Sequence, residues 1–265
     1  MPDDIIKKIM DDVDKQGFPL EVRVTEMLKT HGWRVDNQEA YFDTETGKQR
    51  TVDIVSVKDF DVMPLDKYPH DWAFQVRLIV ECKKCSKPWV FYASDLGRDQ
   101  IRQLLEVNAQ IHIDKEDQSV YPEEPHDVSK EIEDCRGHYQ FGHELSRPIL
   151  DRLANIAYEP FTNGKGNSIQ KARMQIIGAM MDLKHRLEQD TTEILHCILF
   201  KPVIVFDGQL YVYQDQNLSR SEGLYYSVSH HDSRFMIEVV TFDFLQTYLK
   251  GIENNIGDFQ RAFRT

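Results

Sequence analysis

The chain has no apolar run that approaches the roughly 20 residues needed to cross a bilayer. Its first four residues, Met1-Pro2-Asp3-Asp4, also lack the basic start of a secretory signal. We therefore expect a cytoplasmic protein with no membrane partner. With 265 residues, 41% of them hydrophobic and 29% charged, the chain can bury a full core. We expect one elaborated domain over residues 1–265.

Cysteine is scarce as well, because the chain contains four in all. Four are too few for a disulfide scaffold in a chain of this length, so a reducing compartment is the simpler interpretation. The spacings Cys82-x-x-Cys85 and Cys135-x-x-His138 match those of a four-ligand zinc site. Cys82, however, belongs to an apolar strand, where a buried thiol behaves as a small hydrophobe. A zinc-stabilised interaction protein stays open as an alternative that metal analysis would test.

An excess of positive charge is also missing. The formal net charge of −12 argues against a broad, non-specific nucleic-acid binder, since such proteins are usually basic. It does not exclude a nuclease, because part of the negative charge can lie at a metal site and part is concentrated between residues 114 and 134. We expect a homo-oligomer or a partner protein to help such a chain form a usable binding groove.

The most informative motif closes an apolar strand. Residues 74–80 form a β-branched, mostly apolar run that is typical of a buried central strand. Alternation along the strand places Glu81 and Lys83 on one side and Cys82 on the other. Charges at the end of such a strand are costly unless they pair with each other or with a metal ion. We predict that this side of the strand is a catalytic face.

Asp53 lies in a second apolar segment, residues 52–57, and offers another carboxylate. Mg²⁺ takes hard oxygen ligands, usually one or two carboxylates together with water and substrate phosphate oxygens. Asp53 and Glu81 meet that requirement, and Lys83 would orient a metal-bound water or neutralise charge that develops on a phosphate. Each residue alone also has a structural explanation, since Asp53 can cap a turn and Lys83 can snorkel from a strand edge.

Together with Glu21, these residues resemble the PD-(D/E)xK nuclease superfamily, which includes restriction endonucleases, Mrr-like enzymes and archaeal Holliday-junction resolvases. Glu21 opens an amphipathic helix predicted over residues 20–30, although an acidic first-turn residue is also favoured by the helix dipole. Gly32 ends that helix, two strands are predicted at residues 33–35 and 39–42, and a turn at 46–48 precedes the aspartate strand. Val52 stands where the family signature has a proline, a departure shared by many members.

The resemblance implies an α/β, restriction endonuclease-like fold, with a mixed β-sheet flanked by helices and a long insertion or linker at residues 86–165. It implies a DNA endonuclease that hydrolyses phosphodiester bonds with Mg²⁺, for which Mn²⁺ can substitute, in restriction, defence or repair. The catalytic residues would be Glu21, Asp53, Glu81 and Lys83. Asp53, Glu81 and the Cys82 backbone carbonyl would bind the metal. The alternative is a catalytically silent module of the same fold that binds or scaffolds a nucleic-acid-associated assembly.

A second strong helix is predicted over residues 168–186, with Ser168 as its N-cap. The resemblance implies that this helix packs beside the catalytic strand and contacts the DNA backbone. The candidate contacts are Lys165, Lys171, Arg173 and Gln175. A solvated polar face explains the same residues without any ligand.

Three strands are predicted near the end of the chain, at residues 202–206, 209–213 and 235–240, and we expect them to extend the same sheet. Asp207-Gly208 is typical of a hairpin turn between the first two of these strands. Helices are predicted over residues 99–105 and 242–249. We interpret His138, His143, His185, His230 and His231 as ordinary surface or packed histidines.

Overall fold

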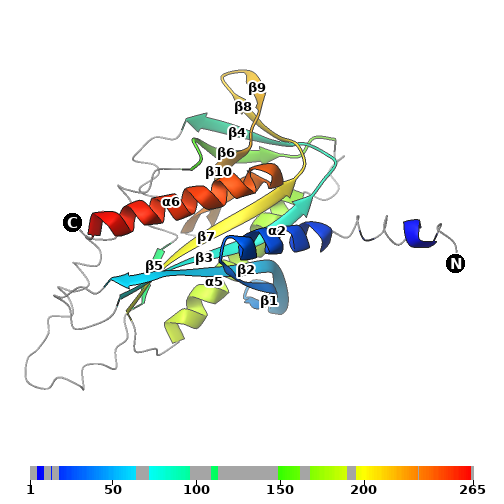
Figure 1. Ribbon diagram of the computed structural model, residues 1–265. Coiled ribbons are helices and arrows are strands. Elements are labelled where there is room, and N and C mark those ends of the chain that lie inside the picture. Colours follow the sequence, from blue (N-terminus) through cyan, green and yellow to red (C-terminus); the bar gives the residue numbers. More distant parts are fainter. Residues whose placement is uncertain are drawn as a thin grey trace, which may run out of the picture.

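The computed structural model describes residues 5–8, 13, 18–63, 72–95, 109–112, 149–161, 168–189, 195–231 and 233–263. One mixed sheet of eleven strands organises these residues, in the order β1-β2-β3-β7-β11-β10-β6-β4-β8-β9, with β5 paired to β7 (Figure 1). The strands are β1 (Arg34–Asp43), β2 (Lys48–Met63), β3 (Trp72–Lys84), β4 (Trp89–Asp95), β5 (Ala109–His112), β6 (Arg152–Tyr158), β7 (Leu195–Asp207), β8 (Leu210–Gln214), β9 (Asn217–Arg220), β10 (Gly223–His230) and β11 (Ser233–Thr241). The chain is therefore a mixed α/β protein whose predicted strands all lie in one sheet.

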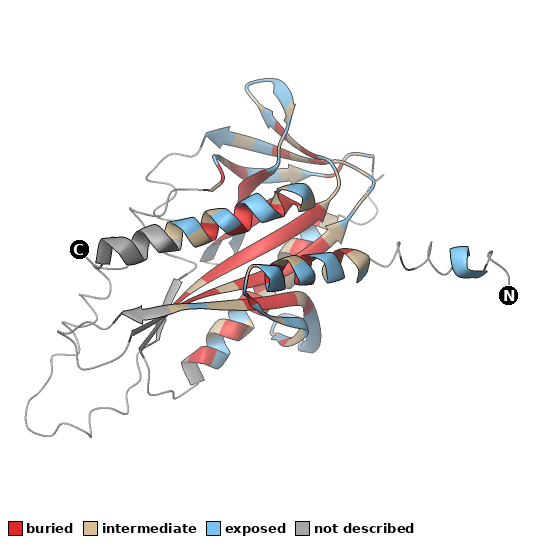
Figure 2. Ribbon diagram, viewed as in Figure 1, coloured by how far each residue is buried: buried red, intermediate tan, exposed pale blue. Residues whose placement is uncertain are grey.

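Helices cover both faces of the sheet, as Figures 1 and 2 show. Helices α2 (Phe18–Thr30) and α6 (Leu245–Phe263) pack on one face, and α5 (Ser168–Gln189) packs on the other. We call the first layer the α2/α6 core; its helical members include Leu20, Val24 and Tyr248. We call the second the α5 core; its helical members include Ile169 and Ile176. Among the described helices, none is long and apolar enough to cross a membrane.

The two helix predictions that frame the sheet are confirmed, with longer bounds. Gly32 follows α2 with a φ of 74°, and its N–H donates to the Lys29 carbonyl at 2.9 Å, which is a common way for a helix to end. At the start of α5, the backbone N–H and hydroxyl of Ser168 both donate to Glu159 Oε2 at 2.9 Å. The closing helix begins with a 3-10 turn, η2 (Phe242–Phe244), which runs into α6.

Strands β3, β7 and β11 form the parallel centre of the sheet. The prediction of a hairpin at Asp207-Gly208 is wrong. One edge of β7 is paired along its length with β3, and the other edge is divided between β5 and β11. Because both edges of β7 are occupied, the chain leaves at Gly208 and β8 pairs with β4 and β9 instead.

Region 86–165 supplies three strands to the sheet. β4 and β6 pair with each other, and the other edge of β6 pairs with β10. β5 pairs with the first half of β7. The helix predicted at residues 99–105 lies outside the described residues, as do residues 113–148.

Candidate active site

The site forms where β2 and β3 separate. Their ladder pairs Ile54 with Val80, whereas β3 continues beside β7 as far as Lys84. At the point of separation, the Cys82 backbone N–H donates to Asp53 Oδ2 at 2.7 Å. A carboxylate therefore satisfies a backbone donor of the central strand where the neighbouring strand turns away.

The separation follows from a change of face in the β1–β2 hairpin. In β1, Val35 packs with the α2/α6 core but Tyr41 packs with the α5 core, although regular alternation would put both on one face. In β2, Ile54 and Val52 are divided between the two cores in the same way. Both changes occur around Asp53 of β2 and Gln38 of β1, which lie opposite each other in the ladder. Gln38 has a φ of 55°.

Beyond this point the hairpin lies on α5. The Arg186 guanidinium of α5 binds Glu39 at 3.0 Å and the Ala40 carbonyl at 2.5 Å. Tyr41 packs against Gly178, where an added Cβ would lie 2.8 Å from the tyrosine ring. The sequence predicted two separate strands at 33–35 and 39–42, whereas the structure has one strand with a single left-handed residue in its middle.

Glu81 is the most deeply buried acid of the site, with no exposed surface. Its Oε1 accepts a hydrogen bond from the Lys83 ammonium, so both side chains lie on the same side of β3. Its buried Oε2 has no hydrogen-bond partner among the described residues. Burial and the negative charge of Asp53 raise the pKa of Glu81 from 4.5 to about 7, although Lys83 and the Asp53 backbone N–H oppose the rise.

Glu21 and Asp53 complete the acidic group. Burial first, and then the negative charge of Asp53, raises the pKa of Glu21 above its ordinary value. Burial likewise raises the pKa of Asp53, while the Cys82 N–H, Lys83 and Gln38 oppose the rise by stabilising the carboxylate. The predicted residues Glu21, Asp53, Glu81 and Lys83 thus interact in one place.

Asp53 and Glu81 offer carboxylate oxygens of the kind that a hard divalent cation takes as ligands. Three carboxyl groups whose pKa values are raised share one site with a single lysine, and one of their buried oxygens lacks a partner among the described residues. Buried charge of one sign is unfavourable unless it is compensated, and carboxylate oxygens are the ligands that Mg²⁺ prefers. Asp53 and Glu81 are the residues that would hold such an ion.

Sequence reasoning missed Gln38. Its Nε2 donates to Glu21 Oε2 at 2.8 Å, and its amide also stabilises the ionised form of Asp53, so it interacts with two of the acids. A non-glycine residue with positive φ is uncommon, and such strain concentrates at functional sites. A glutamine in a polar stretch carries no recognisable sequence signal, and the change of face at Val52 and Tyr41 is visible only in the structure.

We expect Gln38→Ala to weaken Mg²⁺ binding by about tenfold, as is typical when a group that orients a metal ligand is removed. Isothermal titration of the variant with MgCl₂ measures this change. Gln216→Ala is the matched control, because Gln216 is also exposed with a positive φ of 63° but lies in the β8–β9 turn. Equal Mg²⁺ affinity in wild type and Gln38→Ala would show that Gln38 does not position the acids.

The zinc alternative loses support from the geometry. Cys82 is buried in the α2/α6 core, whereas Cys85 packs against the α5 core and its thiol contacts Glu159 Oε1 at 3.7 Å. The two thiols therefore lie in different layers and cannot share one tetrahedral ion without rearrangement. Cys135 and His138 lie outside the described residues.

The candidate DNA contacts on α5 fall into two groups. Lys171 is exposed, and Arg173 and Gln175 are half-buried. Arg173 Nε and Gln175 Oε1 are buried without a hydrogen-bond partner among the described residues. Gln175 lies one turn before Gly178, so it shares the helix face that meets Tyr41. Lys165 lies outside the described residues.

No family model, curated protein or solved structure matches this chain.

Proposed function

We propose that this chain is a metal-dependent DNA endonuclease with a restriction endonuclease-like fold. The observation that carries the proposal is the environment of the Glu81 carboxyl group. It is fully buried, and its Oε1 accepts a hydrogen bond from Lys83. Its Oε2 has no hydrogen-bond partner among the described residues. An acid in that position, close to Asp53 and Glu21, fits a Mg²⁺ ligand better than it fits a structural residue.

Each residue has a distinct task in this proposal. Asp53 and Glu81 hold the cation, with the Cys82 backbone carbonyl as a further ligand, and Glu21 supports its water shell from α2. When bound, Mg²⁺ or Mn²⁺ polarises the scissile phosphate and lowers the pKa of a coordinated water. Lys83, which is 21% exposed at its side chain, orients the attacking water and neutralises charge on the phosphate.

The protonation state of Glu81 also controls whether the site binds a metal ion. Because its pKa is about 7, it carries a proton for a substantial part of the time near neutral pH. A carboxyl group binds a cation in its ionised form, so metal binding releases that proton and strengthens as the pH rises. The hydrogen bond from Lys83 holds Glu81 Oε1 in place in either state.

Substrate contacts are proposed for α5. Lys171 offers an exposed ammonium, and Arg173 and Gln175 carry buried polar atoms that lack partners among the described residues. These groups suit phosphate oxygens of a DNA backbone, which position a duplex without reading its sequence. Cutting both strands calls for two centres, which favours a homo-oligomer or a partner protein.

The proposal is tested by cleavage of supercoiled plasmid and linear single-stranded DNA with Mg²⁺, Mn²⁺ or EDTA. We expect wild type to cut only with metal and Asp53→Ala and Lys83→Ala to cut neither substrate. Lys84→Ala is the matched control, since Lys84 is the exposed next residue on β3 and should leave cutting unchanged. DNA binding without cleavage in wild type would favour the catalytically silent module.

A further inference from the structure

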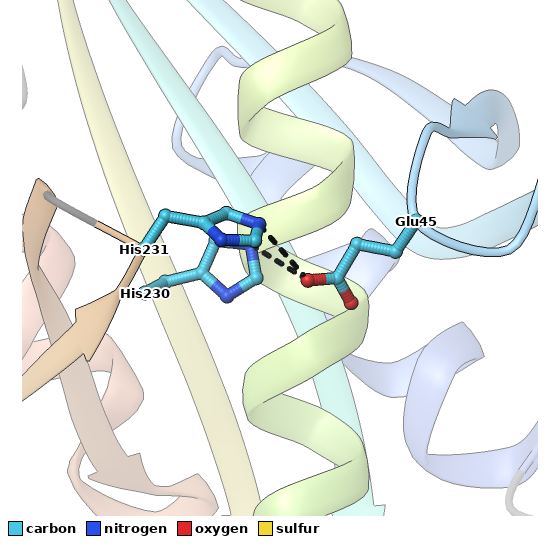
Figure 3. A group of neighbouring side chains, drawn as sticks. All are labelled: Glu45, His230 and His231. Carbon is cyan, nitrogen blue, oxygen red and sulfur yellow. Dashed lines mark ion pairs between the residues drawn. The ribbon is translucent and has the colours of Figure 1, made fainter.

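A second group of possible metal ligands lies apart from the acids of β2 and β3. Glu45 comes from the β1–β2 turn, His230 ends β10, and His231 follows it in the β10–β11 turn. One ligand atom from each residue lies within 4.8 Å of the other two. Figure 3 shows both imidazole rings directed at the Glu45 carboxylate, with α5 behind them.

The separations suit ligands of one ion. Glu45 Oε1 lies 3.4 Å from His230 Nε2 and 3.2 Å from His231 Nε2. Two ligands of a tetrahedral ion with bonds of about 2.0–2.1 Å stand about 3.3 Å apart. Charge-assisted hydrogen bonds are shorter, at about 2.7–2.9 Å. The same carboxylate oxygen therefore sits at ligand distance from both imidazoles.

The backbone brings the two histidines to one side. Successive strand residues point to opposite faces, but His231 has a φ of 49°, which turns it out of the strand direction. The ring centroids are consequently 4.4 Å apart. His230 packs edge-on against Phe235, which restricts the orientation of its ring.

Glu45 is held in place as well. Its backbone N–H and that of Thr46 donate to Asp43 Oδ1 at 3.1 and 3.2 Å, and Asp43 is fixed by an ion pair with Arg50 at 2.6 Å. Gly47, with a φ of 65°, closes the turn. A ligand on such a constrained turn loses little freedom when it binds an ion.

We infer that Glu45, His230 and His231 form a binding site for a first-row transition-metal ion of the Zn²⁺ type. Two imidazoles and one carboxylate are a donor set that such ions favour over Mg²⁺. The site leaves a further coordination position toward solvent, since the His231 side chain is 67% exposed and that of Glu45 39%. A bound ion connects the β1–β2 turn to the β10–β11 turn, two segments far apart in sequence.

The ion would also secure the hairpin that shapes the catalytic site. Asp53 and Gln38 lie midway along the β1–β2 hairpin, and Glu45 lies at its tip. A ligand that binds the folded state alone raises the stability of that state. We therefore expect Zn²⁺ to slow amide hydrogen exchange across residues 39–52 in the full chain.

The test is isothermal titration of ZnCl₂ into the full chain, stripped with EDTA and then kept in excess Mg²⁺ so that hard-oxygen sites are occupied. We expect one zinc ion per chain, and at least about tenfold weaker binding in His231→Ala and in Glu45→Gln. Both substitutions fall on exposed side chains, so the fold should survive, as circular dichroism will verify.

Two controls separate this site from others. His185→Ala removes an exposed histidine on α5, and Asp53→Asn alters the proposed Mg²⁺ site; both should bind zinc like wild type. Absence of zinc binding in wild type overturns the inference. So does binding that survives in both His231→Ala and Glu45→Gln, or that disappears in Asp53→Asn or after alkylation of the cysteines. None of these outcomes depends on whether the chain cleaves DNA.

Discussion

Glu81→Gln is expected to raise the free energy of unfolding of the metal-free protein at pH 8 by about 2–3 kcal/mol, and to lower the proposed metal-dependent cleavage by at least about 100-fold. The two effects have one origin. Glu81 has no exposed surface, and its buried oxygen Oε2 has no partner among the described residues, so its ionised form is unfavourable without a cation. Glutamine keeps the shape of the side chain and removes the charge.

The direction follows from the raised pKa. Below pH 4.5 the carboxyl group is protonated in both the folded and the unfolded chain, and its burial carries no ionisation cost. As the pH rises toward about 7, the unfolded chain releases the proton while the folded chain retains it, so the stability of wild type decreases. A rise in pKa from 4.5 to about 7 corresponds to about 3 kcal/mol, which is fully expressed above pH 7.

Urea unfolding in EDTA at pH 5 and pH 8 measures the effect. We expect the difference in free energy of unfolding between the two pH values to be about 2–3 kcal/mol less in Glu81→Gln than in wild type. Glu26→Gln, on the exposed side of α2, is the control and should follow wild type. If wild type and Glu81→Gln respond equally to pH, burial of the Glu81 charge does not destabilise the fold.

The acids and the lysine of the site were visible in the sequence because charge is unusual in apolar strands. Glu81 and Lys83 interrupt the apolar pattern of β3, and alternation alone placed them together and Cys82 apart. Glu21 was visible through the start of its helix. Gln38 was not, because its role depends on a left-handed backbone and on two partners from α2 and β2 that no local pattern specifies.

The limits on predicting the fold have a similar cause. Helix bounds near Gly32 and Ser168 were predicted closely, because glycine and serine are common at helix ends. Ser168 is nevertheless not the N-cap that was predicted, because it is the first residue of α5 and donates its N–H and hydroxyl to Glu159. The partners of β8 were not, because Asp207-Gly208 favours a turn whether or not the strands on either side pair. β8 cannot pair with β7 because β3, β5 and β11 occupy both edges of that strand, and these three strands come from distant parts of the sequence. The proximity of Glu45, His230 and His231 was not predicted, for the same reason.

A buried polar group beneath α6 provides a second strong test, on the opposite face of the sheet from α5. Glu238 of β11 accepts hydrogen bonds from the Lys201 ammonium of β7 and from the Tyr248 hydroxyl of α6. Glu238 is 2% exposed and Lys201 7%. Burial, together with the negative charge of Glu238, raises the pKa of Tyr248 well above its ordinary value, so the phenol remains a donor.

We expect Glu238→Gln to lower the free energy of unfolding by about 3–5 kcal/mol, because it leaves the Lys201 ammonium buried without a counter-charge. Lys201→Met should have a comparable effect, since it leaves the carboxylate without its cation. The double variant Lys201→Met with Glu238→Gln removes both charges and keeps an oxygen for the Tyr248 hydroxyl. It should therefore recover most of the loss, and a double-mutant cycle from urea unfolding measures the coupling.

Glu253→Gln is the matched control. Glu253 of α6 pairs with Lys58 of β2, but both side chains are partly exposed, at 26% and 22%. A pair of that kind contributes about 1 kcal/mol or less. Additive losses in the Lys201 and Glu238 variants would show that the two charges do not depend on each other. A strong coupling would instead show that this pair stabilises the contact between β7 and β11 beneath α6. Because β7 is also the parallel neighbour of β3, the same pair would then support the strand that carries Glu81 and Lys83.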